Sequence, residues 1–290
     1  MLRFLTILPA PASDSGAGKT RLAAPPAEQR SEHTATDMKT VLIIPEAPGK
    51  DEEIRLIGRS TVYFPLVGLI IGLLLALLYI VFRAALPAAV NSVLLIAALA
   101  VITGAHHIDG LMDTCDALVA GKSRAQRLEI MKDTRVGAFG ITAAILLLLT
   151  KYICLSAVIS VYALLTFPIL SRWAITGLVL LFPTAKESGS FYALKSGADW
   201  SGFIGATIIA LAVTIVMNGL IIGPLIMLGL FGLLYCLGVL FSRLFGGLTG
   251  DCCGALIESG EAITLILSIV FMRLMPYVSS YNLFKIPIPF

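Results

Sequence analysis

The stretch VYFPLVGLIIGLLLALLYIVF, residues 62–82, contains no charged side chain and is long enough to cross a bilayer as one helix. The composition of the whole chain agrees with this. Of its 290 residues, 58% are hydrophobic and 13% are charged, whereas about 25% are charged in a typical soluble domain. The mean hydropathy is +0.93. The sequence therefore predicts an all-α, polytopic membrane helix bundle.

Other apolar runs predict further membrane spans, which bring the total to about seven transmembrane helices (six to eight). These runs are 86–105, two spans within 136–183, 202–222, 224–241 and 263–278. We expect a single membrane-embedded domain, residues 1–290. Residues 10–54 are rich in Pro, Ala, Ser, Glu and Lys, and we expect them to form a polar cytoplasmic segment within this domain.

Basic residues predict the orientation in the membrane. Eight Lys or Arg residues precede residue 60, and five more lie within 106–135. Both regions should face the cytoplasm, and the two predicted spans between them satisfy this parity. Counting the remaining predicted spans places residues 184–199 and 243–261 on the same side, so the charged loops share one compartment.

The stretch HIDGLMDTCDAL, residues 107–118, places three aspartates directly after an apolar run. On a helix, His106, Asp109, Asp113 and Asp116 fall within an arc of about 80°. No Lys or Arg lies four residues further on to relieve the repulsion. Carboxylates in such a stripe suit Mg²⁺ or Mn²⁺. A solvated helix face without an ion is the alternative, and a zinc site is a weaker one.

The next stretch, GKSRAQRLEIMKDTRVGAFG (121–140), is basic. Ser123 and Gln126 form a capping-box pattern that predicts a second helix. On one side of this helix lie Arg124, Arg127 and Arg135, whose guanidinium groups suit the oxygens of a diphosphate. The alternative is that these charges only set the membrane topology.

A second acidic cluster lies far along the chain, in RLFGGLTGDCCGALIESGEAI (243–263). Thr249 is placed to cap a helix on which Asp251, Glu258 and Glu261 share a face. The cluster is predicted on the same side of the membrane as the first, so we expect one shared site. A solvated face is again the alternative.

Isolated basic residues complete the candidate site. Arg172 lies inside an apolar run, a position that usually indicates function or a charged partner. Lys186 lies in a polar loop on the predicted cytoplasmic side. We expect Lys151 and Arg83 to extend to the membrane interface.

Several motifs together resemble the cobalamin synthase family, the adenosylcobinamide-GDP ribazoletransferases. They are LRFLTILPAP (2–11), GRSTVYFPLVGLIIG (58–72), HIDGLMDTCDAL (107–118), RLEIMKDTRVGAFG (127–140), SRWA (171–174) and GGLTGDCCGALIESGEA (246–262). They span nearly the whole chain in the expected order. The chain departs from the family pattern at Ala117, where Gly is expected, at Lys186, where Arg is expected, and in its longer polar segment near 12–54.

The resemblance implies a Mg²⁺-dependent transferase with its active site on the cytoplasmic side of the inner membrane. It would join adenosylcobinamide-GDP to α-ribazole or its 5′-phosphate and release GMP, in the last stage of nucleotide-loop assembly. The expected partners are these small molecules and the lipid bilayer, with no nucleic acid.

The resemblance and the charge pattern together assign roles to individual residues. The expected metal ligands are Asp109, Asp113, Asp116, Asp251 and Glu258. His106 and Asp116 are the candidates to take the hydroxyl proton. The expected substrate-binding residues are Arg124, Arg127, Arg135, Arg172 and Lys186.

Two other functions are compatible with a membrane protein that has clustered carboxylates. A secondary transporter or ion channel would use them for coupling, but such sites lie near the bilayer midplane. Another metal- and diphosphate-using transferase, such as a CDP-alcohol phosphotransferase or a prenyltransferase, is the second alternative. The first of these enzymes needs an Ala-Arg pair after its aspartates, and the chain has none at that spacing.

Overall fold

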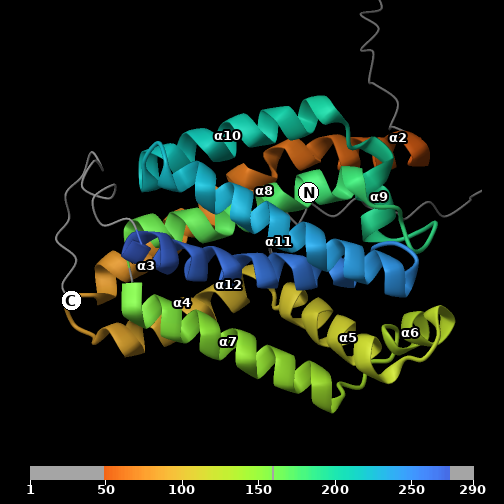
Figure 1. Cartoon of the computed structure of the whole chain (residues 1–290), viewed down its shortest axis with the longest axis horizontal. Helices are drawn as coiled ribbons and strands as arrows, with labels where there is room; N and C mark the ends of the chain where they lie inside the picture. The colour runs from red at the N-terminus through yellow and green to blue at the C-terminus, as the bar shows by residue number, and fades with distance from the viewer. Residues whose placement is uncertain (1–48, 159, 275–290) are drawn as a thin grey trace, which may run out of the picture.

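The computed structural model describes residues 49–158 and 160–274, which are helical with no strand (Figure 1). The helices are α2 (Lys50–Arg59), the 3-10 helix η1 (Ser60–Tyr63), α3 (Phe64–Phe82), α4 (Ala88–Thr103), α5 (His106–Ala120), α6 (Arg124–Ile130), α7 (Ala138–Val158), α8 (Val161–Leu181), α9 (Ser190–Gly197), α10 (Trp200–Asn218), α11 (Ile222–Phe245) and α12 (Gly250–Leu274). This confirms the predicted all-α fold. Residues 10–48 of the predicted polar segment lie outside the described residues.

The described helices confirm a polytopic membrane bundle of about seven spans. Six are long and apolar enough to cross a membrane, and the bent pair α4–α5 gives a seventh if it counts as one span. The predicted pair of spans within 136–183 corresponds to α7 and α8.

Two predicted span boundaries were wrong. The run 86–105 is not a complete span, because α4 ends at Thr103 and α5 continues at an angle of 89°. The last span does not begin at 263 but at Gly250, so the predicted helix of the second acidic cluster and the last span are one continuous helix, α12. Acidic residues lower the local hydropathy, but they do not prevent a helix when partners inside the bundle neutralise them.

The bend between α4 and α5 arises from two consecutive residues in the left-handed conformation. Gly104 has φ 65° and Ala105 has φ 55°. Ala105 is the only residue other than glycine with a positive φ in the described part of the chain. Such a pair cannot continue an α-helix, so α5 turns away from α4 and runs along α12 and α7.

Helix α8 lies at the centre of the bundle and packs against α3, α10, α11 and α12. The contact with α3 depends on two small residues four positions apart. A Cβ atom on Gly68 would lie 2.4 Å from the carbonyl oxygen of Pro168, and one on Gly72 would lie 2.8 Å from that of Leu164. Small residues at this spacing let helix backbones approach closely in a membrane, where van der Waals packing drives association.

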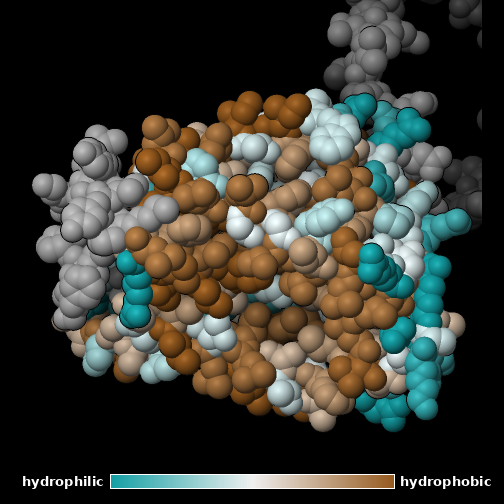
Figure 2. Space-filling view, viewed as in Figure 1, coloured by the Kyte–Doolittle hydropathy of each residue, from teal (hydrophilic) through white to brown (hydrophobic). Residues whose placement is uncertain are grey.

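The surface divides into an apolar belt and a polar end (Figure 2). Large apolar side chains cover the long sides of the bundle, among them Leu77, Val101 and Leu228, which are 58%, 69% and 72% exposed. Charged and polar residues gather at the end where α2, α6 and α9 lie. An apolar surface of this extent suits lipid, so the polar end marks one membrane boundary.

The close contact between α3 and α8 predicts that Gly68→Ala destabilises the protein. The added methyl group would force the two backbones apart, which we expect to cost about 1–3 kcal/mol of stability. The melting temperature of the detergent-purified protein measures this. Gly232→Ala in α11 is the matched control, because a Cβ atom there has no neighbour within 4 Å. An equal effect of both substitutions would contradict the packing described.

Candidate active site

The two acidic segments meet where α5 packs against α12. A Cβ atom on Gly110 would lie 2.8 Å from the carbonyl oxygen of Asp251 and 3.0 Å from its Cα. A Cβ atom on Gly254 would lie 3.2 Å from the Cα of His107. The backbones of α5 and α12 therefore touch at two places one turn apart; a side chain at 110 would force them apart, and one at 254 would be tight.

This contact brings three carboxylates together at the polar end of the bundle. The negative charges of Asp109 and Asp251 both act on the Asp113 carboxylate, together with that of Asp116. Asp109 is exposed, whereas Asp113 and Asp251 are half-buried. Asp109, Asp113 and Asp251 form what we call the acidic group. The prediction that two distant acidic segments converge on one place agrees with this geometry.

The acidic group is not arranged as a complete set of protein ligands for a metal. No three His, Cys, Asp or Glu side chains within 49–158 and 160–274 are grouped so that they could hold a metal ion as they stand. Mg²⁺ keeps several water ligands and commonly binds through one or two carboxylates together with substrate phosphates. Asp113 and Asp251 could supply those carboxylates. Their role as metal ligands stays a prediction.

A cavity of about 140 Å³ adjoins Asp251. Its lining comes from the segment before and at the start of α9, including Lys186, Ser188 and Ser190, and from the start of α12 at Thr249 and Asp251. The positive charge of Lys186 acts on Asp251. A cation, hydroxyl groups and helix N-termini favour an anion such as a phosphate. The acidic group and a place for an anion therefore lie side by side.

The serines of this cavity were missed by the sequence analysis. Ser188 and Ser190 flank Gly189, whose φ of 94° turns the chain into α9. The sequence signal was a Ser-Gly-Ser stretch directly before a short helix on the predicted cytoplasmic side. Such stretches are common in loops, so the signal becomes specific only once Asp251 is known to lie beside it.

Asp116 has a structural contact that the sequence did not indicate. Its two carboxylate oxygens accept hydrogen bonds from the backbone N–H groups of Gly137, at 2.7 Å, and Gly140, at 2.8 Å. A Cβ atom on either glycine would lie 2.5 Å from the carboxylate. Asp116 therefore caps the start of α7 and ties it to α5. Its predicted catalytic and metal-binding roles remain predictions.

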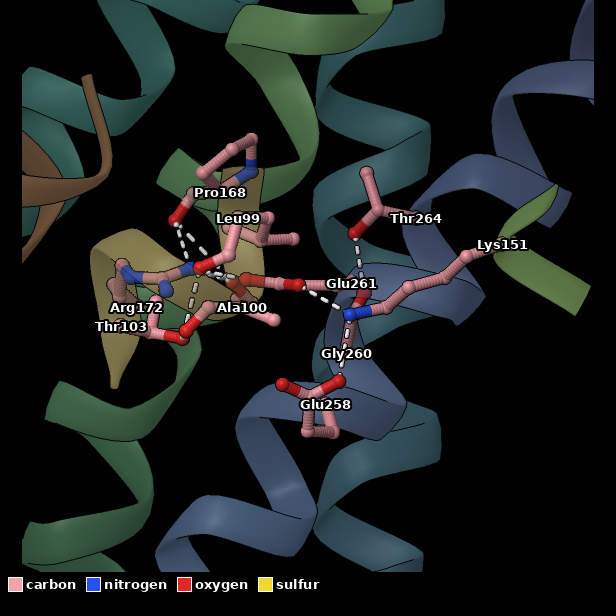
Figure 3. Close-up of polar contacts among 11 residues, drawn as sticks. Leu99, Ala100, Thr103, Lys151, Pro168, Arg172, Glu258, Gly260, Glu261 and Thr264 are labelled. Carbon is pink, nitrogen blue, oxygen red and sulfur yellow. Dashed lines mark hydrogen bonds and ion pairs between the residues drawn. The ribbon is translucent and has the colours of Figure 1, made fainter. Parts of the chain in front are cut away.

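Glu258 and Arg172 do not join the acidic group. Both are buried deeper in the bundle, where Lys151 donates to Glu258 Oε2 and Glu261 Oε2 at 2.6 Å each and Arg172 donates to Glu261 (Figure 3). The prediction that Lys151 extends to the interface was wrong, because its side chain is 2% exposed and ends on two carboxylates. The expected charged partner of Arg172 is Glu261.

The other predicted basic residues lie at the polar end, in different settings. Arg124 donates to the carbonyl oxygen of Ala185 at 3.0 Å, so it braces the segment that carries Lys186. Arg127 folds back over Gly121. Arg135 is highly exposed and forms an ion pair with Asp133 at 2.7 Å, which lowers the pKa of Asp133 to about 2.

His106 begins α5 and is exposed. Its Nδ1 lies 3.2 Å from the carbonyl oxygen of Thr103. If Nδ1 carries the proton and donates to this oxygen, Nε2 is left free to accept one. The geometry is thus compatible with the predicted role of His106 as a proton acceptor.

Local helix signals in the sequence are confirmed. The Ser123 hydroxyl accepts from the N–H of Gln126, and the Gln126 side chain accepts from the N–H of Lys122. The Thr249 hydroxyl accepts from the N–H of Cys252 at the start of α12. The residues before Arg124 and Asp251 therefore fix where each of these side chains enters the site.

Comparison with known proteins supports the resemblance seen in the motifs. The model of the cobalamin-5-phosphate synthase family matches residues 33–269. A protein of Geotalea daltonii named adenosylcobinamide-GDP ribazoletransferase is 40% identical over 217 residues, 72% of this chain and 85% of that protein. Proteins with the same name from Roseiflexus sp. (strain RS-1) and Fusobacterium nucleatum are 36% identical over 229 residues and 34% identical over 257 residues.

These two relatives cover 78% and 77% of this chain, and 84% and 92% of their own lengths. No solved structure matches the chain. The match to the family model includes the helices that carry the acidic group and the adjoining cavity. The chain belongs to the cobalamin-5-phosphate synthase family.

Proposed function

We propose that this chain is a Mg²⁺-dependent adenosylcobinamide-GDP ribazoletransferase. It transfers the cobinamide-phosphate moiety of adenosylcobinamide-GDP to α-ribazole or its 5′-phosphate and releases GMP. The product is adenosylcobalamin or its 5′-phosphate. The family membership supports this reaction over the transporter and over the other transferases considered from the sequence.

One observation carries the proposal: the acidic group lies beside the cavity of Lys186 at the membrane boundary. A diphosphate needs positive charge along its oxygens and on the oxygen that leaves. Lys186 and the N–H groups at the start of α12 supply part of this charge. Asp109, Asp113 and Asp251 supply an excess of negative charge, which suits a divalent cation between protein and phosphate.

The chemistry requires one bond to form and one to break. A ribose hydroxyl oxygen of the acceptor attacks the phosphorus attached to cobinamide, and the bond from that phosphorus to the GMP oxygen breaks. When bound, Mg²⁺ would polarise the phosphoryl group and stabilise the leaving oxygen. Asp113 and Asp251 would hold the ion, Lys186 would orient the diphosphate, and His106 would accept the hydroxyl proton.

We place the site on the cytoplasmic side of the inner membrane, and the charge distribution supports the cytoplasmic side. Helices α3, α7, α10 and α12 lead away from the polar end, so Lys122, Lys132, Lys186 and Lys195 share one side of the membrane. Arg83, at the far end of α3, lies on the other side. Basic residues collect on the cytoplasmic side of membrane proteins.

Asp113→Asn and Asp251→Asn should each lower the rate of GMP release by about 100-fold or more, because each removes a negative ligand without changing side-chain size. The assay uses detergent-purified protein with Mg²⁺, adenosylcobinamide-GDP and α-ribazole. Glu187→Gln is the matched control, since Glu187 is exposed at the same end and lines no part of the cavity. Wild-type protein that releases no GMP would refute the function, and active Asp113→Asn and Asp251→Asn variants would refute the site.

Orientation is tested by labelling single cysteines in a variant that lacks the five native ones. A membrane-impermeant maleimide added to right-side-out spheroplasts should label a cysteine at Arg83. It should label one at Lys132 only after permeabilisation. Labelling of the Lys132 position in intact spheroplasts would contradict a cytoplasmic site.

A further inference from the structure

Four charged side chains form a closed cluster inside the bundle, below the candidate site. Lys151 of α7 bonds Glu258 and Glu261 of α12, and Arg172 of α8 bonds Glu261 (Figure 3). Each of the four side chains is at most 3% exposed. Two positive and two negative charges balance, so we call these residues the neutral cluster.

Stability alone is a poor reason for this arrangement. Removing four charges from water costs several kcal/mol per ion, and packed apolar residues of similar volume are often at least as stable. Arg172 adds to this cost, because its Nε and Nη2 have no hydrogen-bond partner in the described part of the chain. Short, buried ion pairs do, however, fix the geometry between the helices that carry them.

The geometry fixed here is that of the helix bearing Asp251. Glu258 lies seven residues after Asp251, which is about 20° short of two full turns, so both side chains leave α12 on the same face. Glu258 is about 10 Å deeper along the axis. A bond that holds Glu258 in place therefore fixes the rotation of α12 about its axis, and with it the direction in which the Asp251 side chain points.

A small rotation of α12 would disturb the site strongly. Since side chains reach about 5–6 Å from a helix axis, a rotation of about 30° would move the Asp251 carboxylate by about 3 Å. A misplacement of about 1 Å can lower catalysis by about 100-fold. The contact of Gly254 with His107 limits how closely α12 approaches α5, and apolar packing surrounds the helix. The bonds of Glu258 and Glu261, however, are the directional contacts that select one rotation.

We propose that Lys151 and Arg172 are positioning residues that hold α12 through Glu258 and Glu261, and thereby aim Asp251 at the aspartates of α5. Lys151 sets the rotation through Glu258, and Arg172 links the same helix to the central helix α8 through Glu261. This inference rests on the proposed function, because it concerns the metal and phosphate chemistry of Asp251. It assigns a role to side chains that touch neither substrate nor metal.

The test removes both ion pairs of Lys151 while keeping the buried charge balanced. The double variant Lys151→Met/Glu258→Gln leaves Arg172 and Glu261 as a neutral pair, so it should fold, with a melting temperature close to that of the wild type. Its affinity for Mn²⁺, measured without substrate from the EPR signal of free Mn²⁺, should fall at least about tenfold. In the Mg²⁺ assay, kcat should fall by a similar factor while the KM for adenosylcobinamide-GDP changes less than about threefold.

Two further variants complete the design. Lys151→Arg keeps the charge but replaces the compact ammonium with a larger planar guanidinium, so it should lower Mn²⁺ affinity and kcat less than the double variant does. Arg83→Met removes a basic residue at the opposite end of the bundle and is the control. If the double variant does not fold, Glu258→Asp keeps every charge but shortens the reach by one methylene, and it should weaken Mn²⁺ binding in the same way.

The outcomes separate this inference from the proposed function. Wild-type protein that neither binds Mn²⁺ nor releases GMP refutes the proposed function, whatever the variants do. Wild-type activity with unchanged Mn²⁺ affinity and kcat in the folded double variant, or in Glu258→Asp, refutes the positioning role alone. A purely structural cluster predicts this second result, because it would change the melting temperature and the yield but not the site.

Discussion

Backbone contact between α5 and α12 at Gly110 and Gly254 is the constraint on which the rest of the site depends. This contact adds Asp251 of α12 to Asp109 and Asp113 of α5, so that carboxylates far apart in the sequence lie together. Other features fix the two ends of α5. The left-handed pair Gly104 and Ala105 sets its direction, and Asp116 binds its far end to α7.

Carboxylates at two depths of the same interface have different environments. Near the membrane boundary, the positive charge of Lys186 acts on Asp251. The acidic group contains three carboxylates, so negative charge remains in excess there. Deeper in the bundle, Glu258 and Glu261 are matched by Lys151 and Arg172. Excess charge next to water can be satisfied by a hydrated cation and a phosphate, whereas charge within the membrane must be neutralised by the protein. This division agrees with the roles that we propose, catalysis for the acidic group and positioning for the neutral cluster.

Much of the fold follows from patterns that are local in the sequence. The apolar run 62–82, the two spans within 136–183 and the capping signals at Ser123 and Thr249 each depend on neighbouring residues, and each matches the structure. The convergence of Asp113 and Asp251 was also predictable, because a shared membrane side and a shared excess of charge limit where they can lie. The synthase motifs gave the family, which the comparisons support.

The features that could not be predicted from the sequence depend on contacts between distant parts of the chain. The partners of Lys151 lie 107 and 110 residues away, so hydropathy alone suggested an interfacial lysine. The bend after α4 needs Ala105 in a conformation that alanine rarely adopts. Asp116 shares the stripe of Asp113, and only the placement of Gly137 and Gly140 shows that it caps α7.

The most direct test is a metal-specificity switch at the two helices. In Asp113→Cys and Asp251→Cys, thiolate ligands prefer a soft ion such as Cd²⁺ to the hard ion Mg²⁺. If both residues bind the same metal, each variant should be inactive with Mg²⁺ and regain GMP release with Cd²⁺, to a greater extent than the wild type gains under the same conditions. Recovery in neither variant, or in only one of the two, would contradict a metal held jointly by α5 and α12.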